Sequence, residues 1–302
     1  MRNYFINTMI DCARKDDKVA LLMAESGFSV VEPFEKEFPD RFYNTGIAEQ
    51  NLVLTAAGLA MSGMKPVAYT MASFLPSRAF EMIKISVCYQ NLPVVLVATG
   101  SGLSYGPLGS THHSIEESAL MRSLPNMNVL FPCSGEELEA AIKFALSDNK
   151  PYYISFPKLP APQTVATQFE FGKAVKYTNG DRATIFAVGF AVQDAIKAAE
   201  ILKQQGINIS VYGLHTVKPI DTLAILEGAK NRNIFVVDEH QSVGGIGSEI
   251  AKIILENGVS VDKFVDLGIP DCFVDKVTGY NELKDLYNIS AEKIVSKVIN
   301  NI

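Results

Sequence analysis

Short apolar runs of strand length alternate with amphipathic runs of helical period along the first half of the chain. The apolar runs are almost unbroken, which is typical of strands that are buried on both faces of a parallel sheet. We expect strands at Val19–Met23, Pro66–Thr70, Pro93–Thr99, Val129–Phe131 and Tyr152–Phe156, and helices at Tyr4–Ala13, Ala48–Met61, Phe74–Tyr89, Ile115–Met121 and Glu136–Leu146. This alternation predicts a mostly parallel sheet covered by helices.

The pattern breaks at Pro157–Pro162, where three prolines fall within six residues and neither a helix nor a strand can continue. It then resumes, with expected strands at Thr184–Val188, Ile209–Tyr212, Ile234–Val237 and Lys263–Leu267 and helices at Val192–Gln204, Ile246–Leu255 and Ala291–Ile299. We therefore predict an α/β protein of two three-layer domains with mostly parallel sheets. The predicted domains are residues 1–160 and 181–302, joined by a linker over residues 161–180.

Composition narrows the class of protein. A length of 302 residues suits two domains of ordinary size. The net charge of −6 gives no basic face for nucleic acid, and no apolar run approaches the roughly 18 residues that a membrane helix needs. The four cysteines lie far apart at no metal-binding spacing, so we expect reduced thiols in a cytoplasmic protein.

The first candidate for chemistry is Glu49, which falls in the opening turn of an apolar helix. A carboxylate in a first helical turn is common, because it meets the positive end of the helix dipole. Its neighbours Ala48, Leu52 and Val53 are apolar, however, which predicts a buried acid. A buried acid can hold a proton for catalysis near neutral pH, so the structural and functional interpretations both stay open.

A second candidate follows the expected strand Pro93–Thr99. Here a loop with four glycines ends in the pair His112 and His113, two of only four histidines in the chain. Adjacent side chains rarely converge on one metal ion, and no acid or cysteine stands at ligand spacing. The loop therefore favours proton transfer or binding of an oxyanion over a metal site.

Two further segments are ambiguous taken alone. In the expected helix Phe74–Tyr89, the residues Phe74, Ser77, Arg78 and Phe80 could turn an aromatic and polar face toward the same cleft, although phenylalanines more often form core. The segment Val236–Ser248 has a strand, a glycine-rich turn and a helix start, an arrangement that can bind phosphate. It does not match the dinucleotide fingerprint, so its signal is weak.

In combination, these segments resemble a known family. Gly46-Ile-Ala-Glu-Gln, Ser73-Phe-Leu and Gly109-Ser-Thr-His-His resemble, in order and spacing, the pyrimidine-binding domain of transketolases and 1-deoxyxylulose-5-phosphate synthases. Val237-Asp-Glu-His with Gly244-Gly-Ile-Gly is similar to the C-terminal domain of the same enzymes. The resemblance implies a thiamine diphosphate-dependent transferase that moves a two-carbon ketol unit from a ketose donor to an aldehyde acceptor.

The resemblance also implies roles for individual residues. Glu49 matches the glutamate that hydrogen-bonds N1′ of the cofactor's aminopyrimidine and thereby helps to activate the cofactor. Phe74 matches an aromatic side chain that packs on the pyrimidine, and Phe80 falls where a second aromatic is frequent. His112 matches a histidine that faces the substrate oxygens, with His113 beside it.

These enzymes hold the diphosphate and Mg²⁺ with a separate domain that carries G-D-G and a downstream asparagine. No such motif occurs in this sequence. The resemblance therefore implies the C-terminal subunit of a split transketolase, active only with an N-terminal subunit that brings the Mg²⁺ and diphosphate site. Two copies of each subunit would form a heterotetramer with the cofactor at the interfaces.

Three positions depart from the sugar-phosphate pattern of the family. Leu108 stands where conventional transketolases have an aspartate, Phe156 where they have a phosphate-binding arginine, and Gly100 where they have a further histidine. Phenylalanine cannot replace the bidentate guanidinium. We hypothesise a substrate other than the usual sugar phosphates, whose charge, if it has one, is held by Lys158, Arg78 or the partner subunit.

Two alternatives remain open at this stage. The β-subunits of 2-oxo-acid dehydrogenases and decarboxylases share the two-domain layout and the glutamate, although the Thr111-His112 loop and the Gly46-Ile-Ala-Glu-Gln string favour a transketolase. A non-catalytic subunit that only binds a partner is the other alternative, because a fold does not guarantee a function.

Overall fold

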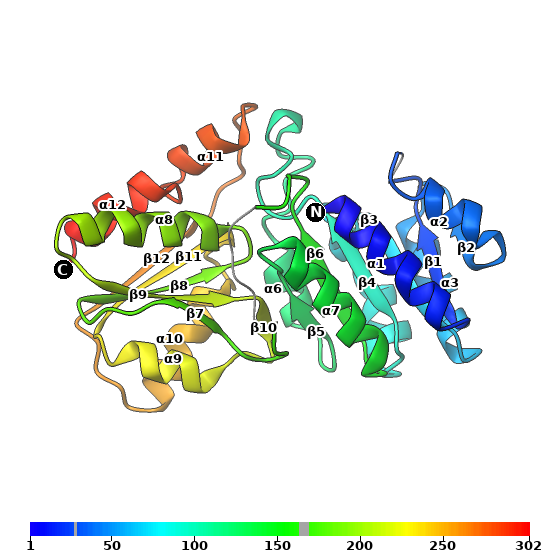
Figure 1. Cartoon of the computed structure of the whole chain (residues 1–302), viewed down its shortest axis with the longest axis horizontal. Coiled ribbons are helices and arrows are strands. Elements are labelled where there is room, and N and C mark those ends of the chain that lie inside the picture. The colour runs from blue at the N-terminus through cyan, green and yellow to red at the C-terminus, as the bar shows by residue number, and fades with distance from the viewer. Residues whose placement is uncertain (27–28, 163–168) are drawn as a thin grey trace.

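The computed structural model describes residues 1–26, 29–162 and 169–302. These residues form two sheets that lie side by side along the long axis of the molecule, each with helices on both faces (Figure 1). The predicted α/β class, with two mostly parallel three-layer units, is confirmed.

The first sheet has seven strands in the order β10-β5-β6-β4-β3-β1-β2. Its strands are β1 (Val19–Met23), β2 (Phe42–Asn44), β3 (Lys65–Met71), β4 (Val95–Thr99), β5 (Asn128–Leu130), β6 (Tyr152–Phe156) and β10 (Thr216–Lys218). All neighbouring pairs are parallel except β10 with β5. Parallel pairing brings the carboxyl ends of six strands to one edge of the sheet, where ligands of such sheets usually bind.

Alternate residues of each central strand enter two different apolar cores. In β4, Val95 and Val97 pack on the side of α1 (Arg2–Lys15) and α7 (Gly135–Ser147). Leu96 and Ala98 point to the opposite side, which is covered by α3 (Glu49–Met61) and by the segment Leu75–Cys88. This double burial explains why these strands read as unbroken apolar runs in the sequence. The remaining helices of this domain are α2 (Glu32–Glu37), the 3₁₀ turns η1 (Pro39–Arg41) and η3 (Gly106–Leu108), and α6 (Glu117–Arg122).

The second sheet has five strands in the order β12-β11-β8-β9-β7. Its strands are β7 (Val175–Thr178), β8 (Ala183–Val188), β9 (Ile209–Leu214), β11 (Asn233–Gln241) and β12 (Lys263–Ile269), and only β7 is antiparallel to its neighbour. One face carries α8 (Ala191–Gln204) and α12 (Ala291–Ile299), with α11 (Tyr280–Leu286) nearby, and the other carries α9 (Thr222–Ala229) and α10 (Ile246–Glu256) (Figure 1).

The two halves of the chain are joined more closely than the predicted linker implies. β7 lies inside the range 161–180 and pairs with β9, so the second sheet begins before residue 181. β10 follows β9 but leaves the second sheet and pairs with β5 at the edge of the first. Both strands have at most four residues, which is too short for a periodic pattern to reveal them.

The single helix expected at Phe74–Tyr89 was a wrong prediction. The segment consists of α4 (Leu75–Arg78), α5 (Phe80–Met82) and a π-helical stretch, η2 (Ile83–Cys88). Its fully buried residues Leu75, Ala79, Ile83 and Val87 recur every fourth position. An α-helix of 3.6 residues per turn would rotate them progressively off the core, and the wider winding of Ile83–Cys88 counters this rotation between Ile83 and Val87.

No helix among the described residues combines the length and the apolar character needed to cross a bilayer. All four cysteines are free thiols.

Candidate active site

Three sequence-predicted segments meet at the carboxyl edge of the first sheet. Glu49 follows β2, the Phe74–Arg78 segment follows β3, and the loop of residues 100–114, called here the His112 loop, follows β4. β3 and β4 are neighbours in the sheet, and the start of α3 reaches the same region from β2. The strand order therefore explains why residues distant in sequence come together.

Glu49 is the first residue of α3 and is only 1% exposed, as its apolar neighbours predict. Its Oε2 accepts a hydrogen bond from Nη1 of Arg78 at 2.7 Å. The Arg78 side chain is 42% exposed, so its guanidinium joins a buried acid to the surface of the site. Of the residues expected on the polar and aromatic face of this segment, Arg78 is the one that binds Glu49.

Phe74 connects the acid to the His112 loop. The guanidinium carbon of Arg78 lies 4.7 Å from the centroid of the Phe74 ring, and the His112 imidazole contacts the same ring edge-on at 5.6 Å between centroids. The Thr111 hydroxyl lies 2.8 Å from Nδ1 of His112, which fixes the orientation of the imidazole. Glu49, Arg78, Phe74 and His112 therefore form one continuous set of contacts.

Tyr105 extends this set on the far side of His112. Its ring centroid lies 6.1 Å from that of the imidazole, and Nζ of Lys158 lies 4.9 Å from the Tyr105 ring. Gly100 makes room for this tyrosine, because a Cβ on Gly100 would stand 2.0 Å from the ring. Gly100 also has φ of +97°, a conformation that favours glycine.

Three other predicted site residues lie outside this set. Phe80 is half-buried and packs on the apolar core beneath α3. His113 is buried, and neither of its ring nitrogens has a hydrogen-bonding partner among the described residues. Burial lowers the pKa of this imidazole. Leu108 is half-exposed on the outer part of the loop.

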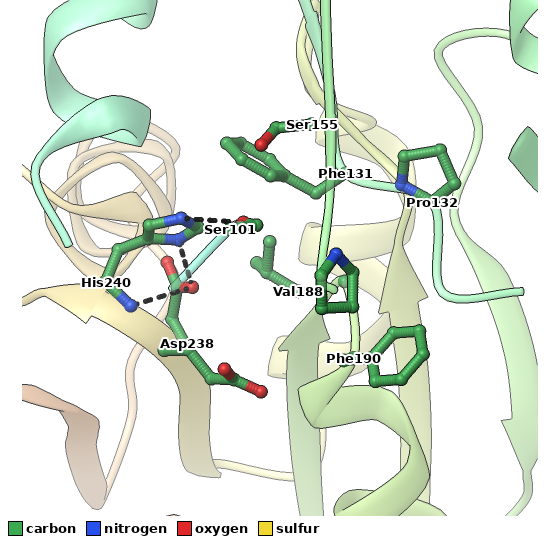
Figure 2. Close-up of a pocket in the computed structure, with 11 residues that line it drawn as sticks. Ser101, Phe131, Pro132, Ser155, Val188, Phe190, Asp238 and His240 are labelled. Atoms are coloured by element: carbon green, nitrogen blue, oxygen red, sulfur yellow. Dashed lines mark hydrogen bonds and ion pairs between the residues drawn. The ribbon is translucent and has the colours of Figure 1, made fainter. Parts of the chain in front are cut away.

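Sequence reasoning missed a buried polar network beside the site, of which Figure 2 shows Ser101, Asp238 and His240. Glu117, in α6, is fully buried and accepts hydrogen bonds from the hydroxyls of Ser101, at 2.6 Å, and Tyr153. His240, at the end of β11, places Nε2 3.1 Å from Glu117 and Nδ1 2.6 Å from Asp238. The network joins the His112 loop and α6 of the first domain to the second domain.

Electrostatics hold His240 as a cation. Burial alone would lower the pKa of the imidazole, but the carboxylates of Asp238 and Glu117 outweigh it and raise the pKa of His240 to about 10. Burial likewise opposes ionisation of Glu117, yet His240 and the Ser101 hydroxyl bring the pKa of Glu117 below its ordinary value. The pair is therefore a buried ion pair at neutral pH.

A small cavity of about 20 Å³ adjoins the network between the two domains (Figure 2). Its polar lining includes Ser101, Ser155, Asp238 and His240. Oγ of Ser155 and Oδ2 of Asp238 have no protein partner among the described residues. A cavity of this size and polarity suits one water molecule and is too small for a substrate.

The glycine-rich turn before α10, considered above as a phosphate site, is exposed at Val243 and Gly244 and buried at Gly245–Gly247. Gly247 lies in the first turn of α10, and a Cβ there would stand 2.4 Å from Oδ2 of Asp266. Burial raises the pKa of Asp266 to about 6. The chain's own carboxylate therefore lies beside the first turn of α10, where it would repel a phosphate. Within residues 1–26, 29–162 and 169–302, no group of three or more His, Cys, Asp or Glu side chains could hold a metal ion.

Comparison with known proteins bears on both domains. Residues 1–163 match the family described as "Transketolase, pyrimidine binding domain", and residues 172–294 match "Transketolase, C-terminal domain". A solved structure described as "Split gene transketolase, inactive beta4 tetramer" is similar over 99% of this chain and 97% of its own, with a TM-score of 0.90 and 33% sequence identity.

Two relatives whose length is similar to that of this chain are named for a substrate, and each is one subunit of a transketolase. A subunit of the apulose-4-phosphate transketolase of Actinobacillus succinogenes is 36% identical over 86% of this chain and 85% of its own length. A subunit of the 6-deoxy-6-sulfo-D-fructose transketolase of a Clostridium species is 35% identical over 98% of this chain and 92% of its own length.

Proposed function

The chain belongs to the transketolase family, and we propose that it is the C-terminal subunit of a split, thiamine diphosphate-dependent enzyme that transfers a ketol unit from a ketose to an aldehyde. The observation that carries this proposal is the buried acid Glu49 in continuous contact, through Arg78 and Phe74, with the His112 loop.

The residues around Glu49 suit an aminopyrimidine. Such a ring needs an acid at its nitrogen edge and an aromatic surface against its face, and Glu49 and Phe74 offer these side by side. Arg78 is the partner of the Glu49 carboxylate in this structure. Because the Arg78 side chain is partly exposed, water can solvate it when a ring nitrogen takes its place beside Glu49, so the exchange costs little desolvation energy. Phe80 packs on the apolar core beneath α3 and so supports this segment from below.

When bound, thiamine diphosphate supplies a nucleophilic carbon for addition to a carbonyl group. Glu49 would hold a proton at the ring nitrogen N1′, where its burial keeps water from competing for that proton. His112 has Nδ1 engaged by Thr111, which leaves Nε2 to hydrogen-bond substrate oxygens and to move their protons.

A partner protein would complete the site. In this proposal the separately encoded N-terminal subunit holds the diphosphate and Mg²⁺, and two copies of each subunit assemble. The two relatives named as transketolase subunits and the solved structure titled an inactive beta4 tetramer support a chain that needs such a partner. Free thiols throughout the chain support a location in the reducing cytoplasm.

The test is to co-express the chain with its N-terminal partner and to assay ketol transfer with and without thiamine diphosphate and Mg²⁺. We expect activity only when both subunits and both cofactors are present. Full activity of this chain alone would contradict the proposal. Acylation of a lipoyl-bearing protein by the pair would support the 2-oxo-acid dehydrogenase alternative instead.

The substrate is proposed to differ from the usual sugar phosphates. Phe156, at the position of the phosphate-binding arginine, is fully buried against Phe5, so it offers nothing to a ligand. Lys158 instead sits over Tyr105, next to His112. The two relatives named for apulose-4-phosphate and for 6-deoxy-6-sulfo-D-fructose support variation of the substrate among similar chains. In a substrate panel, we expect xylulose 5-phosphate to be a poor donor, and a strong preference for it would contradict this.

If the donor carries an anionic group that Lys158 binds, Lys158→Ala should raise its KM about tenfold and leave kcat within about twofold, since only binding is lost. Lys176 provides the matched control, because its Nζ sits over the ring of Tyr212 at 5.1 Å in the second domain. Lys176→Ala should change neither constant. Equal KM values for the two variants would exclude Lys158 from the anion site.

A further inference from the structure

The His112 loop is closed at its base. Gly102 and Ser114 form an antiparallel bridge, in which each backbone N–H donates to the other residue's carbonyl, at 3.2 and 3.0 Å. The residues between them, Leu103–His113, therefore make a closed excursion that carries His112 near its end. Whatever fixes this excursion also fixes the imidazole at the active site.

The second domain holds the beginning of the excursion through Glu239. This buried side chain, at the end of β11, accepts the Leu103 N–H at 3.3 Å on Oε2 and the Tyr280 hydroxyl on Oε1. Gly102 packs so closely that a Cβ on it would stand 2.7 Å from Cβ of Glu239. Its φ of +58° also favours glycine at this contact.

The second domain also holds the middle and the end of the excursion. The backbone at Gly106 lies against the carbonyl of Thr278, which a Cβ would approach to 2.5 Å. The Ser110 hydroxyl donates to the carbonyl of Val274 at 2.5 Å. Just beyond the bridge, the Gln241 N–H donates to the carbonyl of Ile115 at 2.8 Å. None of the second-domain residues that make these contacts is a proposed cofactor-binding residue.

We propose that Glu239 and Tyr280 are positioning residues, through which the C-terminal domain holds the His112 loop in the conformation that presents His112 to the substrate. The inference rests on the proposed role of His112 and assigns a task in the reaction to a domain that lacks Glu49 and Phe74. It also gives the Val237-Asp-Glu-His segment a function, since Glu239 holds the loop and His240 binds Glu117 just after it.

The chain offers a matched control for this proposal. Glu137 is likewise a buried glutamate at the contact between the two domains, and it accepts the Cys133 N–H at 2.7 Å and the Tyr177 hydroxyl at 3.3 Å. None of its hydrogen bonds involves the His112 loop. Removing either glutamate therefore removes a similar interdomain contact, but only Glu239 supports the loop.

The experiment compares Glu239→Ala, Tyr280→Phe and Glu137→Ala in the reconstituted two-subunit enzyme. We expect Glu239→Ala to lower kcat by about tenfold or more, because a small displacement of a reacting group is costly. Its affinity for thiamine diphosphate should stay within about twofold, since Glu49 and Phe74 are untouched. Glu239→Gln should restore most of the kcat, because an amide can accept the Leu103 N–H and donate to Tyr280.

Hydrogen exchange of the Leu103–His113 amides tests the same proposal without any assay of activity. Exchange should be faster in Glu239→Ala and Tyr280→Phe, by about tenfold, and unchanged in Glu137→Ala. Tyr280→Phe removes only a hydroxyl and serves if Glu239→Ala fails to fold. Loop exchange and kcat equal to those of Glu137→Ala would overturn the proposal. A wild-type pair without ketol transfer would refute the proposed function instead, while the exchange result would still decide the loop's support.

Discussion

Replacing Glu49 with glutamine should lower kcat/KM of the two-subunit enzyme by about 10³-fold, the scale of a lost general acid or base. An amide preserves the volume of the side chain but can neither hold nor release the proton that the carboxyl group shares with the cofactor ring. Because Glu49 is only 1% exposed, no bulk water stands ready to replace it. Steady-state ketol-transfer assays of the purified pair give the measurement.

The fold should tolerate this change. Arg78 loses its ionic partner, but its side chain is 42% exposed and can be solvated, so we expect a stability loss of no more than about 1 kcal/mol. The pair should therefore assemble as the wild type does, which size-exclusion chromatography would show.

Glu249 gives the control for Glu49. It too stands in the first turn of a helix, α10, and pairs with an arginine, Arg122, at 3.4 Å. Glu249→Gln should leave kcat/KM within about twofold, since this carboxylate pairs with Arg122 and Lys252 and with no residue of the proposed site. If Glu49→Gln retained as much activity as Glu249→Gln, Glu49 would have no part in proton transfer.

Much of the first domain could be predicted because its strands are buried on both faces. The bounds of β1 and β6 coincide with the apolar runs Val19–Met23 and Tyr152–Phe156. The burial of Glu49 also followed from local signals, since its neighbours on α3 are apolar. The sheet order then brings Glu49, Phe74 and His112 to one edge, as the parallel arrangement requires.

The contacts between the domains could not be predicted in this way. Glu117 and His240 are 123 residues apart, and no periodic pattern encodes their pairing. The sequence offered one signal of this buried network. Three consecutive ionisable residues, Asp238 to His240, directly follow the apolar run of β11 and belong to the same buried strand. A buried strand end with such residues must find partners, but the sequence does not say which. The Asp266 carboxylate beside the following turn could not be predicted for a similar reason, because it comes from another strand.

The largest loss of stability should follow from Glu117→Ala. The substitution leaves the protonated His240 buried with one carboxylate instead of two, and it removes the acceptor of Ser101 and Tyr153. Breaking a buried ion pair from one side costs about 3–5 kcal/mol. Thermal or urea unfolding of the purified chain at pH 7 measures this loss.

A surface pair provides the comparison. Arg232 and Asp262 form a two-bonded ion pair whose side chains are more than half exposed. Asp262→Asn should cost less than about 1 kcal/mol, because water solvates the arginine that is left. A loss for Glu117→Ala no greater than for Asp262→Asn would show that the buried network adds little to stability.

The pH dependence of stability should follow the same network. The folded-state pKa of His240 is raised to about 10, above the ordinary value of about 6.5 for an unfolded histidine. The stabilisation that the folded chain gains from the protonated His240 is therefore complete below about pH 6.5. It is lost as the pH rises from about 6.5 through 10, because in this range the folded chain binds more protons than the unfolded chain. In Glu117→Leu/His240→Leu the imidazole is absent, so this part of the alkaline loss should disappear. An unchanged alkaline profile in the double variant would mean that His240 is not the titrating group.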